Sequence, residues 1–202
     1  MKKYENTTGL ILAGGRAQRM NGEDKGLVQL NGHAMIEYVL ASLAPQVGQL
    51  IINANRNLEA YEQLGCSVVS DELSDFQGPL AGFISGMQFS HSQYIVTAPC
   101  DGPFLCNDYV ARLHQHLAHS QSKICVAHDG NRLQPVYALI DTSLIDSLRA
   151  FLLAGDRKID LWYQQEHYCT ADFSDTTEIF TNINTPEELA LASTTIQPPN
   201  YD

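Results

Sequence analysis

The chain has 202 residues, a hydrophobic fraction of 44% and a formal net charge of −11 at pH 7. A single domain of this length buries enough apolar surface to fold without disulfide bonds or a structural metal. The acidic balance argues against nucleic acids and anionic membranes as partners, since both attract a cationic surface, and no apolar run reaches the ~18 residues that span a bilayer.

Short apolar segments predict strands, and they alternate with segments of helical periodicity. In chain order, the expected strands are 9–13, 49–53, 66–69, 94–98, 123–127, 134–140 and 178–182. The expected helices are 34–44, 58–64, 80–89, 107–119, 142–153 and a last helix opened by 185–188. A hairpin turn at Asp129-Gly130 joins two of the strands. The alternation predicts an α/β fold with a mostly parallel sheet.

We expect one domain over residues 1–192 and a polar, frayed tail over residues 193–202. The five cysteines are odd in number and form no Cys-x-x-Cys pair, so they predict neither a disulfide framework nor a zinc ribbon. The first residues carry no cleavage-like site, so we expect no signal peptide. Reduced thiols and a cytoplasmic location are therefore expected.

Polar or glycine-rich residues follow four of the expected strands. These residues are Gly14-Gly15, Asn53, Asp71 and Asp101. In an open α/β sheet, ligands bind outside the carboxyl ends of the strands. Four such ends that meet at one edge predict a binding site there.

The loop 12–26 combines glycines with cations in an otherwise acidic chain. Residues 1–30 hold five Lys or Arg and three Asp or Glu, a net charge of +2, against −13 for residues 31–202. The loop matches neither the Walker A pattern nor Gly-x-Gly-x-x-Gly. Glycines still let backbone N–H groups approach phosphate, Arg19 can grip phosphate with two hydrogen bonds, and Lys25 adds a point charge. The pattern favours a pocket for a small anion over a chance cluster in a flexible loop.

Two carboxylates at strand ends suit nucleotide chemistry. Asp101 lies in Pro99-Cys100-Asp101-Gly102-Pro103, and a lone carboxylate at such a position suits Mg²⁺, which takes its other ligands from water and phosphates. Asp71 can accept a hydrogen bond from a ribose hydroxyl or from a base N–H. For each residue the alternative is a turn or a helix cap.

The histidines offer no metal site. His114, His116 and His119 fall on one expected helix, but only the last two share a face, so a solvated helix face is expected. The sequence contains no Gly-x-Ser-x-Gly elbow and no local Cys–His grouping that would indicate a nucleophile.

Several motifs together resemble those of the molybdenum cofactor guanylyltransferase (MobA) family, from about Thr8 to Leu189. They are Leu12-Ala13-Gly14-Gly15-x-x-x-Arg19-Met20, Asp24-Lys25-Gly26, Asn53-Ala54-Asn55-Arg56, Asp71, Gly78-Pro79-Leu80-Ala81-Gly82, Pro99-Cys100-Asp101-x-Pro103 and 182–189. The first motif alone is shared with many nucleotidyltransferases, whereas the full set in this order is specific to the family.

The resemblance implies a Rossmann-like nucleotidyltransferase fold with helices on both faces of the sheet. It also implies transfer of GMP from GTP to the terminal phosphate of Mo-molybdopterin, with release of pyrophosphate. The implied GTP-binding residues are Leu12, Ala13, Gly14, Gly15, Lys25, Asn53, Asp71, Gly78, Pro79, Leu80 and Asp101, and Asp101 would also hold Mg²⁺. On the molybdopterin side it implies Asn182 and Asn184, and the basic doublet Arg157-Lys158 is a further candidate beside the alternative of a charged helix start.

The implied reaction agrees with the absence of a catalytic triad. A phosphate monoester has a second pKa of about 6, so the attacking group is ionised near neutral pH and requires no general base. Charge neutralisation at the α-phosphate would come from Mg²⁺ on Asp101 together with Arg19 and Lys25. Two departures from the family pattern stand out. Gly102 replaces a larger residue and is expected to loosen the Asp101 turn, and Asn21 replaces a glycine, which its tolerance of positive φ allows.

Other functions remain open. A related nucleotidyltransferase could use CTP, or a sugar phosphate as acceptor, and a GTP-binding accessory protein would show no turnover. The resemblance also implies exchange of the cofactor with assembly proteins and with molybdoenzyme acceptors.

Overall fold

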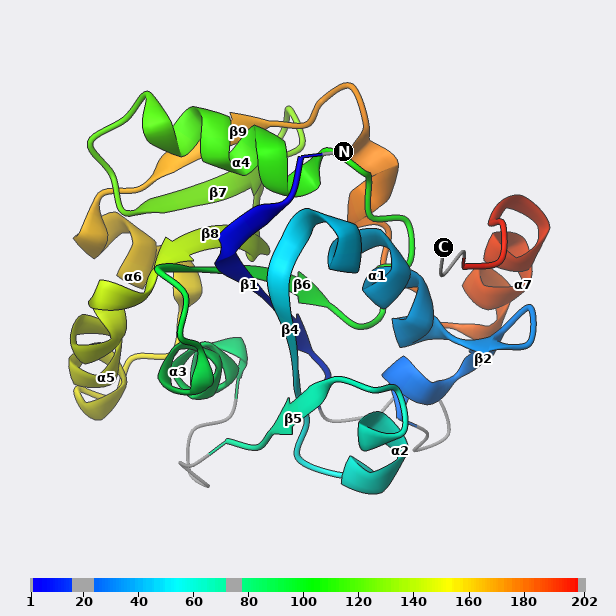
Figure 1. Ribbon diagram of the computed structural model, residues 1–202. Helices are drawn as coiled ribbons and strands as arrows, with labels where there is room; N and C mark the ends of the chain where they lie inside the picture. The colour runs from blue at the N-terminus through cyan, green and yellow to red at the C-terminus, as the bar shows by residue number, and fades with distance from the viewer. Residues whose placement is uncertain (1, 16–23, 72–77, 200–202) are drawn as a thin grey trace.

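The computed structural model describes residues 2–15, 24–71 and 78–199. Within them, seven strands form one sheet in the order β5-β4-β1-β6-β8-β7-β9 (Figure 1). The strands are β1 (Tyr4–Leu12), β4 (Val47–Asn53), β5 (Ser67–Val69), β6 (Tyr94–Pro99), β7 (Ile124–His128), β8 (Leu133–Asp141) and β9 (Cys169–Asp172). Only β8 runs against its neighbours β6 and β7, whereas the other pairings are parallel. The expected α/β class with a mostly parallel sheet is confirmed.

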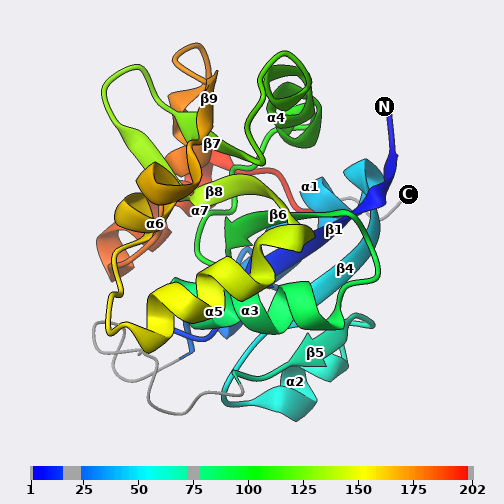
Figure 2. The ribbon, with the colours of Figure 1, turned by 90° about the vertical axis from the view of Figure 1, so that its left-hand side faces the viewer.

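Helices cover both faces of the sheet, as expected (Figure 1). They are α1 (Met35–Leu43), α2 (Leu58–Glu62), α3 (Pro79–Phe89), α4 (Tyr109–Ala118), α5 (Ile145–Leu153), α6 (Ile159–Glu166) and α7 (Pro186–Thr195). One face packs against α3, α5 and α6 through Phe83, Phe151 and Trp162. Figure 2 shows α3 and α5 side by side on that face. The other face packs against α1, α2 and α4.

The central strand β1 shows why the strands read as unbroken apolar runs. Leu10 and Ile11 are both 0% exposed, but they belong to opposite core clusters, because successive side chains of a strand point to opposite faces. A sheet covered on both faces therefore needs apolar residues at every position. The same burial fixes the direction in which β1 delivers the loop that follows it.

The half of the sheet around β9 differs from expectation. The strand expected at 178–182 is wrong, because Thr177–Phe180 forms a 3-10 turn, η4, that buries Ile179. The edge position belongs instead to β9, which pairs with β7. The sequence Cys-Thr-Ala-Asp of β9 carries little apolar signal because only one of its residues is buried.

Two further elements, a helix and a hairpin, were not predicted from the sequence. Helix α6 follows directly after Lys158 and buries Ile159, Trp162 and Tyr163, an i, i+3, i+4 pattern that predicts a helix. Strands β2 (Gln29–Leu30) and β3 (His33–Ala34) form a small hairpin. Its turn, Asn31-Gly32, has positive φ at both residues, which is the sequence signal for this type of turn.

The C-terminal helix α7 opens at the expected proline and continues to Thr195, into the segment expected as a tail. Thr185 caps it, because its side chain accepts a hydrogen bond from the N–H of Glu188 at 3.2 Å. No helix of the described residues is long and apolar enough to cross a membrane. All five cysteines lie within the described ranges and are free thiols.

Candidate active site

The carboxyl ends of four parallel strands are aligned at one edge of the sheet. Leu12 is in register with Asn53 on one side and with Pro99 on the other, and Asn53 is in register with Val69. The N–H of Ala13 extends this ladder, because it donates to the carbonyl of Asn53 at 2.8 Å. The loops after β1, β4, β5 and β6 therefore start side by side, which is the arrangement expected of a binding edge.

Lys25 and Asp101 form the charged centre of this edge. Lys25 lies in the 3-10 turn η1 (Lys25–Leu27), and its Nζ is 2.9 Å from Oδ2 of Asp101. The Lys25 amine also donates to the Oδ1 atom of Asn184. Side-chain exposure is 24% for Lys25 and 12% for Asp101. Three residues far apart in the chain thus meet at one cation, where a phosphate would find both positive charge and hydrogen-bond donors.

The turn that carries Asp101 packs closely against its surroundings. The carbonyl of Asp101 accepts the N–H of Ile183 at 2.9 Å. A Cβ atom added to Gly102 would lie 2.4 Å from the hydroxyl of Tyr137. That hydroxyl donates to Oδ1 of Asn182 at 3.3 Å. The glycine at position 102 therefore makes room for Tyr137, and the backbone hydrogen bond holds the turn that the sequence analysis expected to be loosened.

Asp71 is held by two amide side chains. The Nδ2 atom of Asn53 donates to Asp71 Oδ1 at 2.9 Å, and the Nδ2 atom of Asn55 donates to Oδ2 at 2.8 Å. Asn53 is 2% exposed. A Cβ atom on Gly82 would lie 2.4 Å from Asn53 Oδ1, so α3 approaches this cluster through a residue without a side chain. Asn53 and Asp71 are thus brought together as expected.

A buried polar network missed by the sequence analysis holds Asp24. Its Oδ1 accepts the Tyr61 hydroxyl at 2.6 Å, and its Oδ2 accepts the Asn57 amide at 3.1 Å and lies 3.3 Å from Nε of Arg56. Burial is the main cause that raises the pKa of Tyr61 far above its ordinary value. Since Asp24 directly precedes Lys25, this network fixes the backbone from which Lys25 extends. The polar run Asn53-Ala54-Asn55-Arg56, which directly precedes Asn57, was the sequence signal that could have indicated this network.

The remaining expected nucleotide residues lie at the same edge with different exposure. Gly78 precedes α3 with φ of 142°, and Pro79 begins that helix. Ala13 is 3% and Leu80 is 2% exposed, so both side chains belong to the core and only their backbones could face a ligand. A Cβ atom on Gly15 would meet no described atom within 4 Å. Arg19 and Asn21 lie outside the described residues.

The basic doublet occupies the connection between α5 and α6. Nη1 of Arg157 donates to the carbonyl oxygens of Leu152 at 3.1 Å and Asp156 at 3.0 Å, so it caps the end of α5. Lys158 is exposed and directly precedes α6. Arg157 therefore has a structural role, whereas the charge of Lys158 faces solvent.

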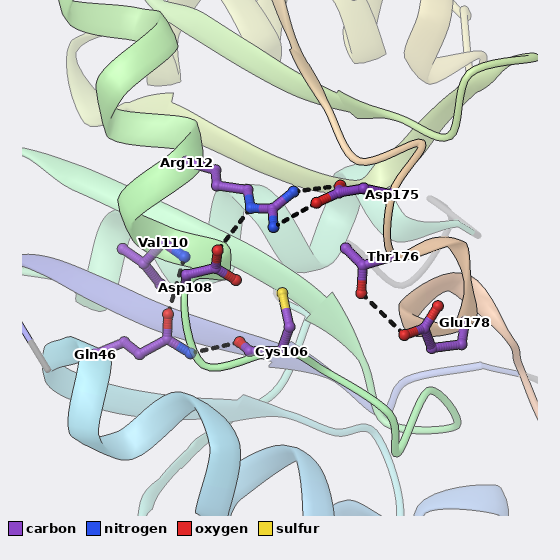
Figure 3. Close-up of polar contacts among 8 residues, drawn as sticks. All are labelled: Gln46, Cys106, Asp108, Val110, Arg112, Asp175, Thr176 and Glu178. Atoms are coloured by element: carbon purple, nitrogen blue, oxygen red, sulfur yellow. Dashed lines mark hydrogen bonds and ion pairs between the residues drawn. The ribbon is translucent and has the colours of Figure 1, made fainter.

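Figure 3 shows Arg112 of α4 in contact with Asp175, which lies in the chain segment before Asn182 and Asn184. The guanidinium of Arg112 forms two contacts with the carboxylate of Asp175, at 2.5 and 3.0 Å, and a third with Asp108 at 2.7 Å. Planar, two-point pairs of this kind restrict orientation as well as distance. The contact ties the start of the segment 173–184 to a helix of the core.

One of the three histidines that the sequence placed on a single helix departs from the expected solvated face. His114 stacks on Tyr4 with ring centroids 4.2 Å apart, and its Nε2 lies 2.8 Å from the hydroxyl of Thr7. Burial, aided by Lys2, lowers the pKa of His114 from 6.5 to about 4. His116 and His119 are exposed as expected.

The donors at the site fit Mg²⁺ but not a metal cage built from the protein alone. Among the described residues, no group of three or more His, Cys, Asp or Glu could hold a metal ion. Asp101 offers one carboxylate, largely buried, at the edge where phosphates would enter. Magnesium is commonly bound in this way, by one or two carboxylates plus water and substrate phosphates.

A family model and closely similar named proteins indicate the same family for this chain. Residues 9–169 match the family described as "MobA-like NTP transferase domain". Proteins named molybdenum cofactor guanylyltransferase from Shewanella sp. (strain MR-4) and Shewanella pealeana are 49% and 48% identical over 89% of the chain, covering 91% and 90% of their own lengths.

Solved structures share the fold. A molybdopterin-guanine dinucleotide biosynthesis protein A from Archaeoglobus fulgidus superposes with a TM-score of 0.75 at 25% identity, over 93% of this chain and 97% of that one. A nucleotidyl transferase from Methanothermobacter thermautotroptrophicus reaches 0.70 at 20% identity, over 93% and 96% of the two chains, and supports the fold alone.

Proposed function

Because the chain belongs to the family of MobA-like nucleotidyltransferases, we propose that it is a molybdenum cofactor guanylyltransferase. It transfers GMP from GTP to the terminal phosphate of Mo-molybdopterin and releases pyrophosphate. The observation that carries the proposal is the meeting of Lys25, Asp101 and Asn184 at the carboxyl edge of the sheet. A cation, a carboxylate and an amide there match the needs of a triphosphate with its metal.

The nucleotide would lie along the ends of β1, β4 and β5. The backbone of Leu12 to Gly15 would approach the phosphates, with Arg19 as a further cation. Asn53 and Asp71 would bind the nucleoside, since they already share a hydrogen bond at 2.9 Å. The start of α3 at Gly78 would border the same space, and its N-terminus favours negative charge.

The transfer needs positioning more than acid–base chemistry. An oxygen of the acceptor phosphate forms the new bond to the α-phosphorus of GTP, while the bond from that phosphorus to the bridging oxygen of pyrophosphate breaks. The attacking phosphate has a second pKa of about 6 and is already ionised. Lys25 would hold the reacting phosphates and neutralise part of their charge, and its contact with Asn184 would direct the amine.

Asp101 would hold Mg²⁺, which neutralises phosphate charge and orients the triphosphate when it is bound. The acceptor would lie on the side of Asn182 and Asn184, which follow η4. The exposed Lys158 would attract its phosphate from the connection between α5 and α6. We also propose that the protein works in the cytoplasm and exchanges the cofactor with assembly and molybdoenzyme acceptor proteins.

The test is pyrophosphate release, measured with GTP or CTP in the presence and absence of Mo-molybdopterin. We expect release with GTP that requires both Mg²⁺ and the acceptor. Preference for CTP would assign the chain to a cytidylyl relative, and release with a sugar phosphate would change the acceptor. Binding of GTP without any release of pyrophosphate would indicate a GTP-binding accessory protein instead of an enzyme.

A further inference from the structure

Asn55 holds Asp71 at two points. Its Nδ2 donates to Oδ2 of Asp71 at 2.8 Å, and its Oδ1 accepts the backbone N–H of the same residue at 2.9 Å. Both the carboxylate and the backbone of Asp71 are thereby fixed by one side chain. Because Asn53 donates to Oδ1 of Asp71 at 2.9 Å, both carboxylate oxygens are bound and the carboxylate has little freedom to rotate.

The backbone of Asn55 is itself fixed by an extension of the sheet. The N–H of Ala54 donates to the carbonyl of Val69 at 2.9 Å, and Ser70 Oγ donates to the carbonyl of Ala54 at 2.9 Å. The chain after β4 is thus tied to the chain after β5 up to the position of Asp71. The side chain of Asn55 extends from a rigid support.

Asn55 also lies close to the glycine turn after β1. A Cβ atom on Gly14 would lie 2.9 Å from Nδ2 of Asn55. The same amide therefore lies between the turn proposed to meet the phosphates and the carboxylate proposed to meet the nucleoside.

The hydrogen bonds of Asn55 contribute little to folding. The side chain is exposed, and exposed polar groups exchange protein partners for water at small net cost. A side chain that adds little stability yet holds both the carboxylate and the backbone N–H of Asp71 suits a positioning role better than a structural one.

We propose that Asn55 is a positioning residue that holds the Asp71 carboxylate in the orientation required for nucleotide binding. The inference rests on the proposed function, because it assigns Asn55 to the site that takes the nucleoside triphosphate. Asn55 acts through Asp71 and does not need to touch the nucleotide.

Two substitutions separate orientation from bulk. Asn55→Ala removes both hydrogen bonds. Asn55→Asp keeps the shape but places an oxygen 2.8 Å from Oδ2 of Asp71, where like charges repel. The matched control is Asn6→Ala at the opposite end of the sheet, where Asn6 exchanges two hydrogen bonds with Gln93 at 3.2 and 3.1 Å.

The experiment measures the Kd of Mg·GTP by calorimetry for the wild-type protein, both Asn55 variants, Asp71→Ala, the double variant Asn55→Ala/Asp71→Ala, and the control. We expect Asn55→Ala to raise Kd about 10-fold, on the scale of a charge-assisted hydrogen bond, and Asn55→Asp to raise it further. In the Asp71→Ala background, Asn55→Ala should have no further effect, and Asn6→Ala should bind like wild type. The melting temperature of Asn55→Ala should stay within about 2 °C of wild type.

The outcomes are distinct. If the wild-type protein binds GTP and Asn55→Ala binds equally well, or its effect persists fully without Asp71, the positioning role is overturned and the proposed function stands. A large fall in melting temperature with an unchanged Kd would make Asn55 a structural residue. No binding of GTP by the wild-type protein would overturn both proposals.

Discussion

The two ends of the parallel strands carry polar clusters of opposite character. At the amino end, the hydroxyl of Thr8 donates to Ser92 at 2.9 Å and accepts from Ser90 at 2.8 Å, in a chain of neutral groups that satisfy one another. At the carboxyl end, Lys25 and Asp101 bring opposite charges to within 2.9 Å, and their side chains are 24% and 12% exposed. Neutral groups that pair among themselves stabilise the fold, whereas charges held at a rim remain available to a ligand.

The largest effect is expected from Asp101→Ala. Loss of the one carboxylate proposed to hold Mg²⁺ should lower metal-dependent transfer by more than about 100-fold, measured as pyrophosphate release over a Mg²⁺ titration. Asp141→Ala is the control at the amino end, where Asp141 accepts the Ser143 N–H at 2.9 Å. It should cost about 1 kcal/mol of stability and leave the activity unchanged. Full Mg²⁺-dependent rates in Asp101→Ala would exclude the metal assignment.

Lys25→Ala should lower kcat by roughly 10- to 100-fold and change the KM for GTP less, because its charge is proposed to act mainly at the reacting phosphates. Steady-state kinetics with saturating acceptor gives both constants. Lys123→Ala is the matched control, since Lys123 donates to Ser143 Oγ at 3.0 Å away from this edge. A raised KM with an unchanged kcat would mean that Lys25 binds GTP equally in the ground state and the transition state, which would contradict this role.

Gly102→Ala should destabilise the protein by about 1–3 kcal/mol and lower the transfer rate, because its Cβ would lie 2.4 Å from the Tyr137 hydroxyl. Tyr137→Phe removes that oxygen, so the double variant should regain much of the lost stability in urea unfolding. If the double variant is no better than Gly102→Ala, the collision with Tyr137 is not the cause.

Lys158→Glu should raise the apparent KM for Mo-molybdopterin a few-fold at low ionic strength, with kcat for GTP retained, because an exposed charge acts through attraction that salt screens. Lys3→Glu at the amino end, where Lys3 pairs with Glu5 at 3.5 Å, serves as the control. An unchanged KM would show that Lys158 does not attract the acceptor and only precedes α6.

The smallest effect concerns His114, which belongs to the amino end. Burial lowers its pKa from 6.5 to about 4, so between these values the unfolded chain binds a proton that the folded protein does not. Its contribution to stability is present above pH 6.5 and is lost as the pH falls toward 4. Between pH 6.5 and 4, the melting temperature of His114→Gln should therefore fall by a few degrees less than that of the wild-type protein. Identical pH profiles would contradict the assignment.

The same contrast explains what the sequence could predict. The strands β1, β4 and β6 are buried on both faces, so Leu10, Ile11 and their counterparts form unbroken apolar runs. Polar residues stand at or just after the ends of β4 and β6. The sequence therefore predicted that Asn53 and Asp101 lie at one edge of the sheet. The positions of these residues follow from local pattern and general topology.

Other features depend on contacts that local pattern does not carry. The short edge strand β9 buries only Ala171 of its four residues, while the apolar Ile179 lies in a 3-10 turn. The fit of Gly102 against Tyr137 joins residues that are distant in the chain. Likewise, the local sequence places Tyr61 in a helix but does not show that its hydroxyl donates to Asp24 at 2.6 Å.

Hydrogen exchange with and without Mg·GTP tests the central claim, that the carboxyl end of the parallel strands binds the nucleotide and the amino end does not. We predict increased protection in peptides covering 12–15, 24–27, 53–55 and 99–102. Peptides covering 4–8 and 90–94 should be unchanged. Protection at the amino end, or none at either end under conditions that support turnover, would contradict the account.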